Sequence, residues 1–411
     1  MHRVVITGVG AYSPVGSTWD EVEATLRAGK NQVRHMTEWD VYDGLNTRLG
    51  APVSHFEIPE HFTRKKTRSM GRVSLMATSA SENALIDAGL LDDPILTSGR
   101  VGVAYGSSSG STDAISDFGN MLINRTLDGI TATTYIRMMG HTAAVNIGVY
   151  FGLTGRIINS SVACASGSQG IGYAYEAVRD GKQDVMLAGG GEELCPTQAA
   201  VFDTLYATST RNDAPETTPQ PFDADRDGLV IGEGACTMIL ERRDRALARG
   251  AKIYAEIVGY ETNSDGAHVT QPTSATMQRV MELALEDAGL SPTAIGYVSA
   301  HGTATDRGDV AESQATYSVF GERMPISALK SYTGHTLGAC GALESWTAIE
   351  MMNHGWFMPT ANLNTVDERC APLDYITGPG RELDVEYVMN NNIAFGGINT
   401  SLIFRRHDPA N

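Results

Sequence analysis

The segment ALIDAGL at residues 84–90 returns later in the chain as ALEDAGL at residues 284–290. Each copy closes an amphipathic helical pattern, and its glycine stands where helices commonly end in a left-handed residue. A short apolar strand pattern follows each copy, at residues 101–105 and 297–300, and leads into a polar loop rich in Gly, Ser or Thr. This repeated order of helix, strand and loop predicts two related halves.

The repetition continues further along each half. LAGGG at residues 187–191 and IAFGG at residues 393–397 hold matching places, and β-branched runs alternate with helical patterns throughout. Such alternation is typical of an α/β protein with buried strands. We expect the halves to meet near residue 250, which gives domains of residues 1–250 and 251–411. Coincidence is the alternative, because DAGL is a common helix ending, but the repeated order of elements favours duplication.

The composition is that of a large globular protein. Of the 411 residues, 42% are hydrophobic and 19% are charged, a balance that favours an extensive core over disorder. The net charge of −17 argues against nucleic acid or an anionic membrane surface as a partner, because both would repel the chain. No apolar run reaches the length of about 18 residues that predicts a membrane span, and the N-terminal residues lack the long apolar core of a secretory signal.

The five cysteines are odd in number, widely spaced and without a CxxC pair. They are Cys164, Cys195, Cys236, Cys340 and Cys370. This pattern predicts reduced thiols in a cytoplasmic protein, with neither disulfide bonds nor a zinc site.

Cys164 is the candidate nucleophile, within NSSVACASGS at residues 159–168. A strand pattern ends just before this segment and a helical pattern at residues 170–178 follows it, so we expect Cys164 near a helix N-terminus. The positive end of the helix dipole favours a thiolate, which would lower the thiol pKa from its ordinary value of about 8.5. The neighbouring residues are small and leave room for a substrate. A buried structural cysteine is the alternative.

Two further segments place polar groups after predicted strands, where catalytic groups of α/β proteins commonly lie. His301 opens HGTAT, residues 301–305, whose threonines could hydrogen-bond a polar ligand arm; a histidine that only binds the loop backbone is the alternative. Lys330 and His335 lie in the turn between a strand pattern, residues 325–329, and a helix of small residues. The apolar and small flanks of Lys330 argue against an ordinary surface lysine.

The segment NNIAFGGIN, residues 391–399, contains a double glycine after Phe395. The glycines free the backbone to aim an N–H group at a developing oxyanion. Phe395 itself could pack in the core or act as a movable plug, and the sequence alone favours core packing.

Taken in order, these segments resemble the beta-ketoacyl-[acyl carrier protein] synthases of type II fatty acid synthesis, in the synthase I/II branch. The likeness covers essentially all 411 residues and extends to PFD at 221–223, RDG at 226–228 and GEGA at 232–235. GGGEELC at 189–195 is most similar to synthase I. A cysteine, two histidines and a lysine together separate this branch from synthase III, which uses Cys–His–Asn, and from the thiolases.

The resemblance implies a fold and a reaction. The fold would be thiolase-like, an α/β architecture of five α/β/α/β/α layers built from two duplicated halves, and usually a dimer. An acyl carrier protein would deliver an acyl chain to Cys164. Malonyl-carrier would then lose CO₂, and the resulting enolate carbon would attack the acyl-Cys164 carbonyl to give 3-oxoacyl-[acyl carrier protein].

The resemblance also assigns the two histidines and the lysine. His301 and His335 would face the malonyl thioester carbonyl and promote loss of CO₂. Lys330 would orient the histidine network, with Glu344 as its partner. Neutral imidazole N–H donors in a dry pocket can stabilise an enolate without a metal ion, and no cofactor is implied beyond the phosphopantetheine that the carrier brings.

Further implied contacts surround the acyl group. Backbone N–H groups of Cys164 and Phe395 would hold the tetrahedral oxyanion, and Phe395 would be the gate that opens for malonyl. Thr303 and Thr305 would bind the pantetheine arm, and Phe202 would lie beside the acyl tunnel.

An acidic carrier protein needs a basic surface on a chain that is itself acidic. RKKTR at residues 64–68 contributes Arg64, Lys65, Lys66 and Arg68, and the resemblance places carrier docking in this region. An ordinary solvated face is the alternative for such a run. The dimer would contain a second copy of the chain or a related synthase or chain-length subunit.

The last segment departs from the family pattern Asn-Ser-Phe-Gly-Phe-Gly-Gly-Thr-Asn. Asn392, Ile393, Ala394 and Ile398 stand in place of Ser, Phe, Gly and Thr, and HGTAT continues with Asp306-Arg307. Alanine beside the gate should restrict the backbone relative to glycine. The catalytic set is intact, so these changes bear on the substrate, and a specialised synthase of polyene or polyketide chains is an alternative to primary fatty acid synthesis.

Two other functions share this fold. A non-catalytic chain-length partner subunit would lack the active cysteine, whereas Cys164 is present. A thiolase-type enzyme would use coenzyme A esters without decarboxylation and would need a second catalytic cysteine. That residue would be Cys340 or Cys370, and neither stands in the expected segment.

Overall fold

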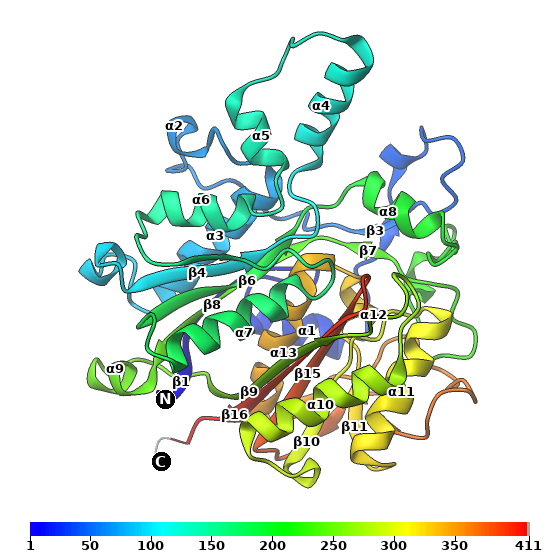
Figure 1. The fold of residues 1–411 in the computed structure, drawn as a ribbon. Coiled ribbons are helices and arrows are strands. Elements are labelled where there is room, and N and C mark those ends of the chain that lie inside the picture. The colour runs from blue at the N-terminus through cyan, green and yellow to red at the C-terminus, as the bar shows by residue number, and fades with distance from the viewer. Residues whose placement is uncertain (409–411) are drawn as a thin grey trace.

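The computed structural model, which describes residues 1–408, has an 11-stranded sheet whose two parts, called here the first and second sheets, share the same five-stranded topology (Figure 1). The first sheet has the order β5-β4-β6-β8-β1, with β1 (Val4–Tyr12), β4 (Val101–Gly106), β5 (Ile157–Asn159), β6 (Val185–Glu192) and β8 (Gly234–Arg242). The second has the order β11-β10-β15-β16-β9, with β9 (Ala255–Ser264), β10 (Ile295–Ser299), β11 (Pro325–Ser327), β15 (Tyr387–Ala394) and β16 (Ile398–Arg406). A short strand, β13 (Asp374–Tyr375), extends the second sheet beyond β11.

Strand directions repeat as well. β4 runs parallel to β5 and β6, and β8 is antiparallel to both β6 and β1. In the second sheet β10 runs parallel to β11 and β15, and β16 is antiparallel to both β15 and β9. The two sheets join where β1 pairs with β9, from Val4 opposite Ile257 to Ile6 opposite Ala255. The predicted duplication is therefore confirmed strand by strand.

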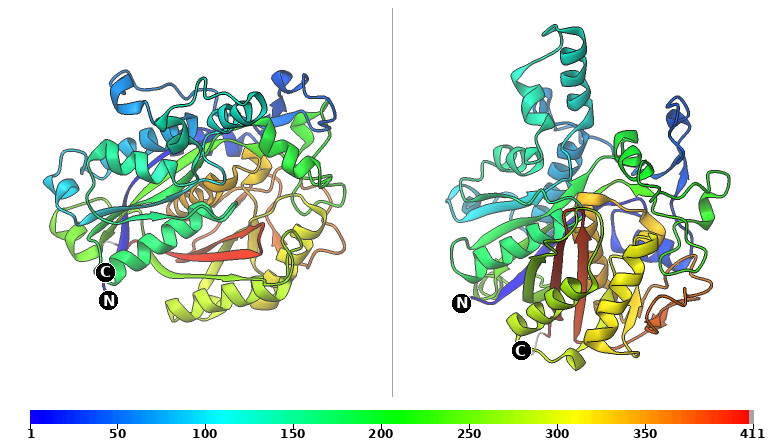
Figure 2. Two further views of the ribbon diagram at one scale, coloured as in Figure 1. Left: turned by 45° about the horizontal axis from the view of Figure 1, so that its top comes forward. Right: turned by 45° about the vertical axis from the view of Figure 1, so that its right-hand side comes forward.

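Helices form three layers around the two sheets (Figures 1 and 2). α3 (Arg72–Asp87) and α6 (Thr142–Phe151) cover the outer face of the first sheet, and α10 (Ser274–Ala288) and α11 (Asp306–Phe320) cover the outer face of the second. α7 (Ser166–Arg179) and α13 (Cys340–His354) lie between the sheets. The predicted five-layered α/β/α/β/α architecture is confirmed.

The repeated sequence segment has a structural reason. Both copies end a helix of the outer layers, α3 and α10, and the glycine after each has a positive φ, +66° at Gly89 and +65° at Gly289. The aspartate of each copy accepts a hydrogen bond from the neighbouring strand: Asp87 from the N–H of Val9 at 2.9 Å and Asp287 from the N–H of Tyr260 at 3.1 Å. The repeat therefore specifies how each outer helix docks on its sheet.

The two central helices approach closely through glycine. A Cβ atom on Gly167 of α7 would lie 2.9 Å from the Ala342 nitrogen of α13, and one on Gly341 of α13 would lie 2.7 Å from the Ser168 nitrogen of α7. No larger side chain fits between backbones at this distance, so the small residues in the first turns of α7 and α13 serve the packing of the central layer.

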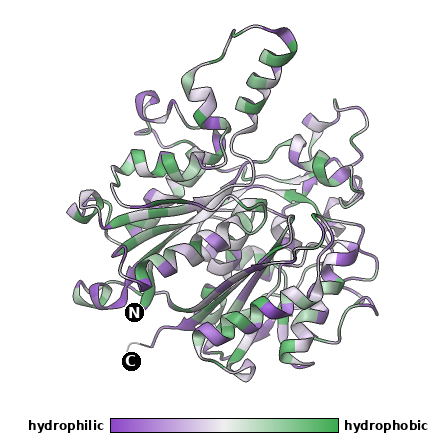
Figure 3. Ribbon diagram, in the orientation of Figure 1, coloured by the Kyte–Doolittle hydropathy of each residue, from purple (hydrophilic) through white to green (hydrophobic). Residues whose placement is uncertain are grey.

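The remaining helices and short strands lie around the two sheets and the helices that cover them. Apolar residues concentrate in the strands and in the helix faces against them (Figure 3). The remaining helices are α1 (Trp19–Arg27), α2 (Arg64–Thr67), α4 (Thr112–Asn124), α5 (Ala132–Met138), α8 (Pro196–Asp203), α9 (Arg243–Ala248) and α12 (Lys330–Thr333). A small sheet contains β2 (Arg34–His35), β3 (Leu49–Ala51) and β7 (Ile231–Gly232), and β12 (Trp356–Phe357) pairs with β14 (Arg381–Glu382). Among the helices of residues 1–408, none has both the length and the apolar character needed to cross a membrane.

The connection between the halves runs from the end of β8 at Arg242, through α9, to the start of β9 at Ala255. The boundary expected at residue 250 falls in this connection, and the division into residues 1–250 and 251–411 stays a prediction.

Candidate active site

Cys164 lies in a tight turn between β5 and α7, two residues before the first residue of the helix. The Ser166 hydroxyl closes this turn, accepting from the N–H of Val162 at 2.9 Å and donating to the carbonyl of Ala163 at 2.7 Å. Ala163 has a φ of +50°, a conformation that costs energy for a residue with a Cβ atom. The turn presents the Cys164 side chain, 4% exposed, to an internal cavity. Its expected position beside a helix N-terminus is thus as predicted.

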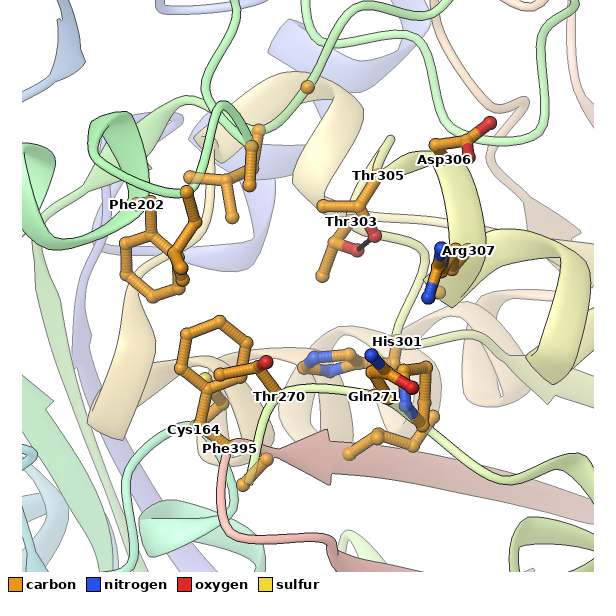
Figure 4. A pocket seen from close by; sticks show the side chains of 18 of the residues that line it. Cys164, Phe202, Thr270, Gln271, His301, Thr303, Thr305, Asp306, Arg307 and Phe395 are labelled. Carbon is orange, nitrogen blue, oxygen red and sulfur yellow. Dashed lines mark hydrogen bonds between the residues drawn. The ribbon is translucent and has the colours of Figure 1, made fainter. Parts of the chain in front are cut away.

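Two histidines from the second half meet this cysteine. His301 follows β10, and His335 lies between α12 and α13. The Cys164 sulfur and one nitrogen of each imidazole all lie within 4.8 Å of one another. The two rings are nearly perpendicular, with centroids 5.2 Å apart. Residues far apart in the sequence therefore form one compact group, in the region that Figure 4 shows around Cys164 and His301.

Hydrogen bonds assign the same tautomer to both histidines. Lys330 Nζ lies 3.1 Å from His301 Nδ1, and a lysine ammonium can only donate. The N–H of Leu337 donates to His335 Nδ1 over 3.3 Å. With Nδ1 accepting in each ring, a neutral imidazole carries its proton on Nε2. Each ring makes its hydrogen bond within the protein through Nδ1, and its Nε2–H group can therefore donate to a ligand.

Burial keeps these imidazoles neutral. It lowers the pKa of both His301 and His335 well below the ordinary histidine value, and the nearby Lys330 charge lowers both further. At neutral pH the pair consists of hydrogen-bond donors without positive charge.

Lys330 is held by a buried network. It forms an ion pair with Glu344, and both side chains are almost inaccessible to solvent. Burial by itself would lower the pKa of Lys330, but Cys340 and the Glu344 carboxylate outweigh it and raise the pKa. The structure places Lys330 at the start of a short helix, α12, where the sequence predicted an open turn; only His335 lies in the turn that follows.

Asn392 is a member of this network that the sequence interpretation missed. Its Nδ2 donates to Glu344 Oε2 at 2.6 Å and lies 3.4 Å from His301 Nδ1. Its Oδ1 accepts from Asn390 Nδ2 at 3.0 Å. The only sequence signal was that asparagine stands where the family pattern has serine.

Two carboxylates of α11 were also missed. Glu312 accepts the N–H groups of His301 and Gly302 at 2.6 and 2.8 Å, and Asp309 accepts those of Thr303 and Ala304 at 3.0 and 3.1 Å. Burial raises the pKa of Glu312 to about 7 and that of Asp309 to about 6. Their spacing of three residues on one helix, directly after HGTAT, is the signal that could have identified them.

The expectation of a lowered Cys164 pKa is wrong for this closed pocket. Burial raises the pKa of the thiol to about 12, although the Lys330 charge and the backbone N–H groups of Phe395 and Cys164 lower it. A helix dipole contributes roughly 0.3–1 kcal/mol, whereas full burial can shift a pKa by several units. Cys164 therefore rests as a neutral thiol, with two backbone N–H groups directed at its sulfur.

A cavity of about 510 Å³ opens from this group. Cys164, His301 and His335 line it, and so do Thr303 and Thr305, whose hydroxyls lie 2.9 Å apart (Figure 4).

Two phenylalanines complete the wall near the sulfur. The Phe202 ring centroid lies 5.0 Å from that of Phe395 and 6.4 Å from that of His335. Phe395 thus stands in the cavity wall as well as packing on a neighbour, where the sequence alone favoured core packing. Cys340 lies behind Cys164, its thiol donating to the Cys164 carbonyl at 3.2 Å, and is not among the residues that line the cavity.

The basic run lies elsewhere on the surface. Arg64, Lys65 and Lys66 belong to α2, Arg68 follows it, and all four are exposed. Lys66 lies over the Tyr150 ring, and within residues 1–408 none of the four forms an ion pair. None of them lines the cavity.

Comparisons with known proteins agree with this arrangement. The profile of the beta-ketoacyl synthase N-terminal domain matches residues 1–246, and that of the C-terminal domain matches residues 254–364. The chain is 38% identical to 3-oxoacyl-[acyl-carrier-protein] synthase 1 of Escherichia coli over 99% of each chain.

Solved structures show the same relationship. A crystal structure of a beta-ketoacyl synthase from Burkholderia phymatum superposes with a TM-score of 0.98 at 63% identity, covering 99% of this chain and 100% of that one. A complex of a type II PKS acyl-carrier protein with its ketosynthase, bound to the hexaketide, superposes with a TM-score of 0.88 at 31% identity, covering 99% of this chain and 100% of that one. Fold, site and sequence agree: this chain belongs to the beta-ketoacyl synthase family.

Proposed function

We propose that the chain catalyses decarboxylative condensation of malonyl-[acyl carrier protein] with an acyl thioester held on Cys164, giving 3-oxoacyl-[acyl carrier protein]. The observation that carries this proposal is the group formed by the Cys164 sulfur and two neutral imidazoles, all within 4.8 Å and all facing one cavity. A nucleophile and two uncharged donors suit acyl transfer followed by enolate stabilisation.

The first half-reaction moves the acyl chain onto the enzyme. The Cys164 sulfur attacks the carrier thioester, its proton passes to the departing carrier thiol, and a new thioester forms. The backbone N–H groups of Cys164 and Phe395 are directed at this sulfur, so they are placed to receive the oxyanion of the tetrahedral intermediate. A thiol with a raised pKa is a weak nucleophile, so we expect proton removal to accompany attack rather than precede it.

The second half-reaction forms the carbon–carbon bond. Malonyl-carrier loses CO₂, and the electron pair of the broken bond forms an enolate on the thioester. His301 and His335 donate their Nε2–H groups to the enolate oxygen, and one such donor is typically worth about 3 kcal/mol. The enolate carbon then attacks the acyl-Cys164 carbonyl, and the Cys164 thiolate leaves and takes up a proton. Holding one reactant covalently makes this step effectively unimolecular.

Other residues support these steps. Lys330 and Glu344 hold His301 in the tautomer that donates from Nε2. Thr303 and Thr305 place hydroxyls in the cavity wall for the amide groups of the pantetheine arm. Phe395 would act as the gate that admits malonyl, and its neighbour Phe202 would border the acyl tunnel. The mechanism needs no metal and no cofactor besides the carrier's phosphopantetheine.

We propose that the carrier docks on the exposed cations of residues 64–68, because they have no ion-pair partners among residues 1–408 and the carrier is acidic.

A dimer, with a second copy or a related chain-length subunit, is proposed from another surface. α4 and α5 project from the body of the molecule (Figure 2), and Leu122, Ile123 and Leu127 there are 72%, 79% and 74% exposed. The nearby strand β5 is the last strand of the first sheet, and its outer edge pairs with no other strand of the described residues.

A cytoplasmic location is also proposed, because all five cysteines are free thiols. Primary fatty acid synthesis and a specialised polyene or polyketide pathway are both compatible with this chemistry. A chain-length subunit without catalysis is disfavoured by the intact cysteine and histidines. A thiolase mechanism is disfavoured because Cys340 lies behind Cys164 and outside the cavity lining.

Incubation with acyl-carrier and carboxyl-labelled malonyl-carrier tests the proposal. The wild-type chain should release labelled CO₂ and yield a 3-oxoacyl-carrier longer by two carbons than the acyl group supplied. Release of no CO₂ and formation of no elongated product would leave only a binding or structural role for this chain. A Cys340→Ser variant is the control for the thiolase mechanism and should retain activity.

A further inference from the structure

Arg307 is a solvent-exposed cation in the cavity wall, in the first turn of α11. Within residues 1–408 its guanidinium has neither a hydrogen bond nor an ion pair. Of the two arginines that line the cavity, Arg226 pairs with Asp367, whereas Arg307 has no partner among the residues that the structure describes. An unpaired guanidinium at the opening of the cavity is therefore a candidate site for an anionic ligand.

The other charged side chains that line the cavity are already engaged. Asp306 pairs with Arg369 at 2.7 Å, and Asp227 pairs with Arg211 at 3.5 Å. The remaining two are Arg226, which pairs with Asp367 at 2.6 Å, and Glu312, which binds backbone N–H groups of the HGTAT loop. Although Asp306 is adjacent in sequence, its carboxylate is directed to Arg369, so Arg307 remains available for an anion.

The position of Arg307 along the cavity indicates which anion. Figure 4 shows Thr303 and Thr305 across the open space from Cys164, with Arg307 next to them on the side away from Phe202, so the cavity is bordered by a nucleophile, then two hydroxyls and then a cation. A phosphopantetheine arm carries in the same sequence a thioester, two amides and a phosphodiester. With the thioester at Cys164 and the amides beside the threonines, the phosphodiester would lie at the mouth.

We propose that Arg307 binds the phosphodiester of the carrier's phosphopantetheine arm, an inference that rests on the function proposed above. A guanidinium presents paired N–H donors that match two phosphate oxygens, and its charge cannot be lost in the accessible pH range. The positive end of the α11 dipole lies at the same place and favours the same anion.

The test compares malonyl-phosphopantetheine with malonyl-pantetheine, which lacks only the phosphate, as substrates for decarboxylation. These small substrates exclude the carrier protein surface and so separate Arg307 from the basic run at residues 64–68. Because a charge-assisted contact is worth roughly tenfold or more, the wild-type protein should use the phosphorylated substrate about tenfold more efficiently in kcat/KM, chiefly through KM. Arg307→Gln should reduce this ratio to near one, and Arg307→Lys should restore part of it.

Arg323→Gln is the matched control. Arg323 is also exposed, and within residues 1–408 it has no ion-pair partner. It lies just beyond the other end of α11 and outside the cavity lining, so its loss should leave the ratio unchanged. A wild-type protein without preference for the phosphate, or an Arg307→Gln variant that keeps it, would overturn the phosphate site. Failure to decarboxylate either substrate, or malonyl-carrier itself, would instead contradict the proposed function.

Discussion

In the first half of the molecule, Gly8 on β1 lies against α3, where an added Cβ atom would come within 2.3 Å of the Ala84 carbonyl. In the second half, Gly259 on β9 lies against α10 in the same way, and its Cβ would come within 2.5 Å of the Ala284 carbonyl. The contact between strand and outer helix has thus been kept residue for residue. A scaffold contact of this kind leaves little freedom for change, because any larger side chain would separate the layers.

The carboxyl ends of the strands differ between the halves. β4 leads into a serine-rich loop without a histidine, whereas its counterpart β10 leads into His301. The turn before α7 carries Cys164, and the turn before its counterpart α13 carries His335. One half therefore contributes the cysteine and the other contributes both imidazoles and the lysine. Duplication supplied the frame, and divergence at the strand ends supplied the chemistry.

The largest expected effect concerns the buried ion pair between Lys330 and Glu344, both in the second half. Lys330→Met leaves the Glu344 carboxylate buried without its cation, and breaking such a pair typically costs about 3–5 kcal/mol. We expect urea denaturation to show this loss in the free energy of unfolding. The double variant Lys330→Met with Glu344→Gln removes both charges and should recover part of it. Equal stability of the single and double variants would mean that the charge pair is not what holds the network.

The next effect separates the chemistry of the two halves. His335→Ala removes one of the two Nε2–H donors and should slow malonyl decarboxylation about 10²–10³-fold, while acylation of Cys164 in the first half stays largely intact. Labelled CO₂ release and intact protein mass measure the two half-reactions. His55→Ala, at an exposed histidine outside the cavity lining, is the control. Equal losses in both half-reactions would contradict the division of roles.

A smaller effect should be the same in both halves. Gly8→Ala and Gly259→Ala each force a methyl group against a helix backbone, and we expect each to lower the free energy of unfolding by about 1–3 kcal/mol. Gly119→Ala is the matched control, because Gly119 lies within α4 and, apart from its chain neighbours and the backbone of its own helix, no atom of residues 1–408 lies within 4 Å of an added Cβ. That change should stabilise slightly, since alanine favours helix. A large effect at one of the two sites and none at the other would show that the contacts are not equivalent.

The last prediction concerns the pH dependence of Cys164 alkylation in the first half. With the pKa of the Cys164 thiol raised to about 12, the thiolate fraction grows about tenfold per pH unit across the neutral range. The rate of iodoacetamide labelling at Cys164, followed by peptide mass spectrometry, should rise steadily from pH 7 to pH 9. A plateau near pH 7 would show that the helix N-terminus outweighs burial after all.

Local sequence patterns predicted the duplication and the place of each reactive group. Cys164, His301 and His335 all follow predicted strands, and the fold brings these strand ends together. The sequence could not give the Cys164 pKa, because the burial that raises it, and the Lys330 charge and Phe395 N–H group that lower it, are set by the tertiary fold rather than by the adjacent helix. It also missed Asn392 and Glu312, whose hydrogen-bond partners are set by tertiary contacts and not by neighbouring residues.

We propose that a single sulfur atom, that of Cys164, carries the acyl chain at the junction of the two halves. The intact mass of the wild-type protein after incubation with acyl-carrier should increase by one acyl group, and the Cys164→Ala variant should show no increase at all. A Cys164→Ala protein that still gains the acyl mass, with the group located on another residue, would contradict the account.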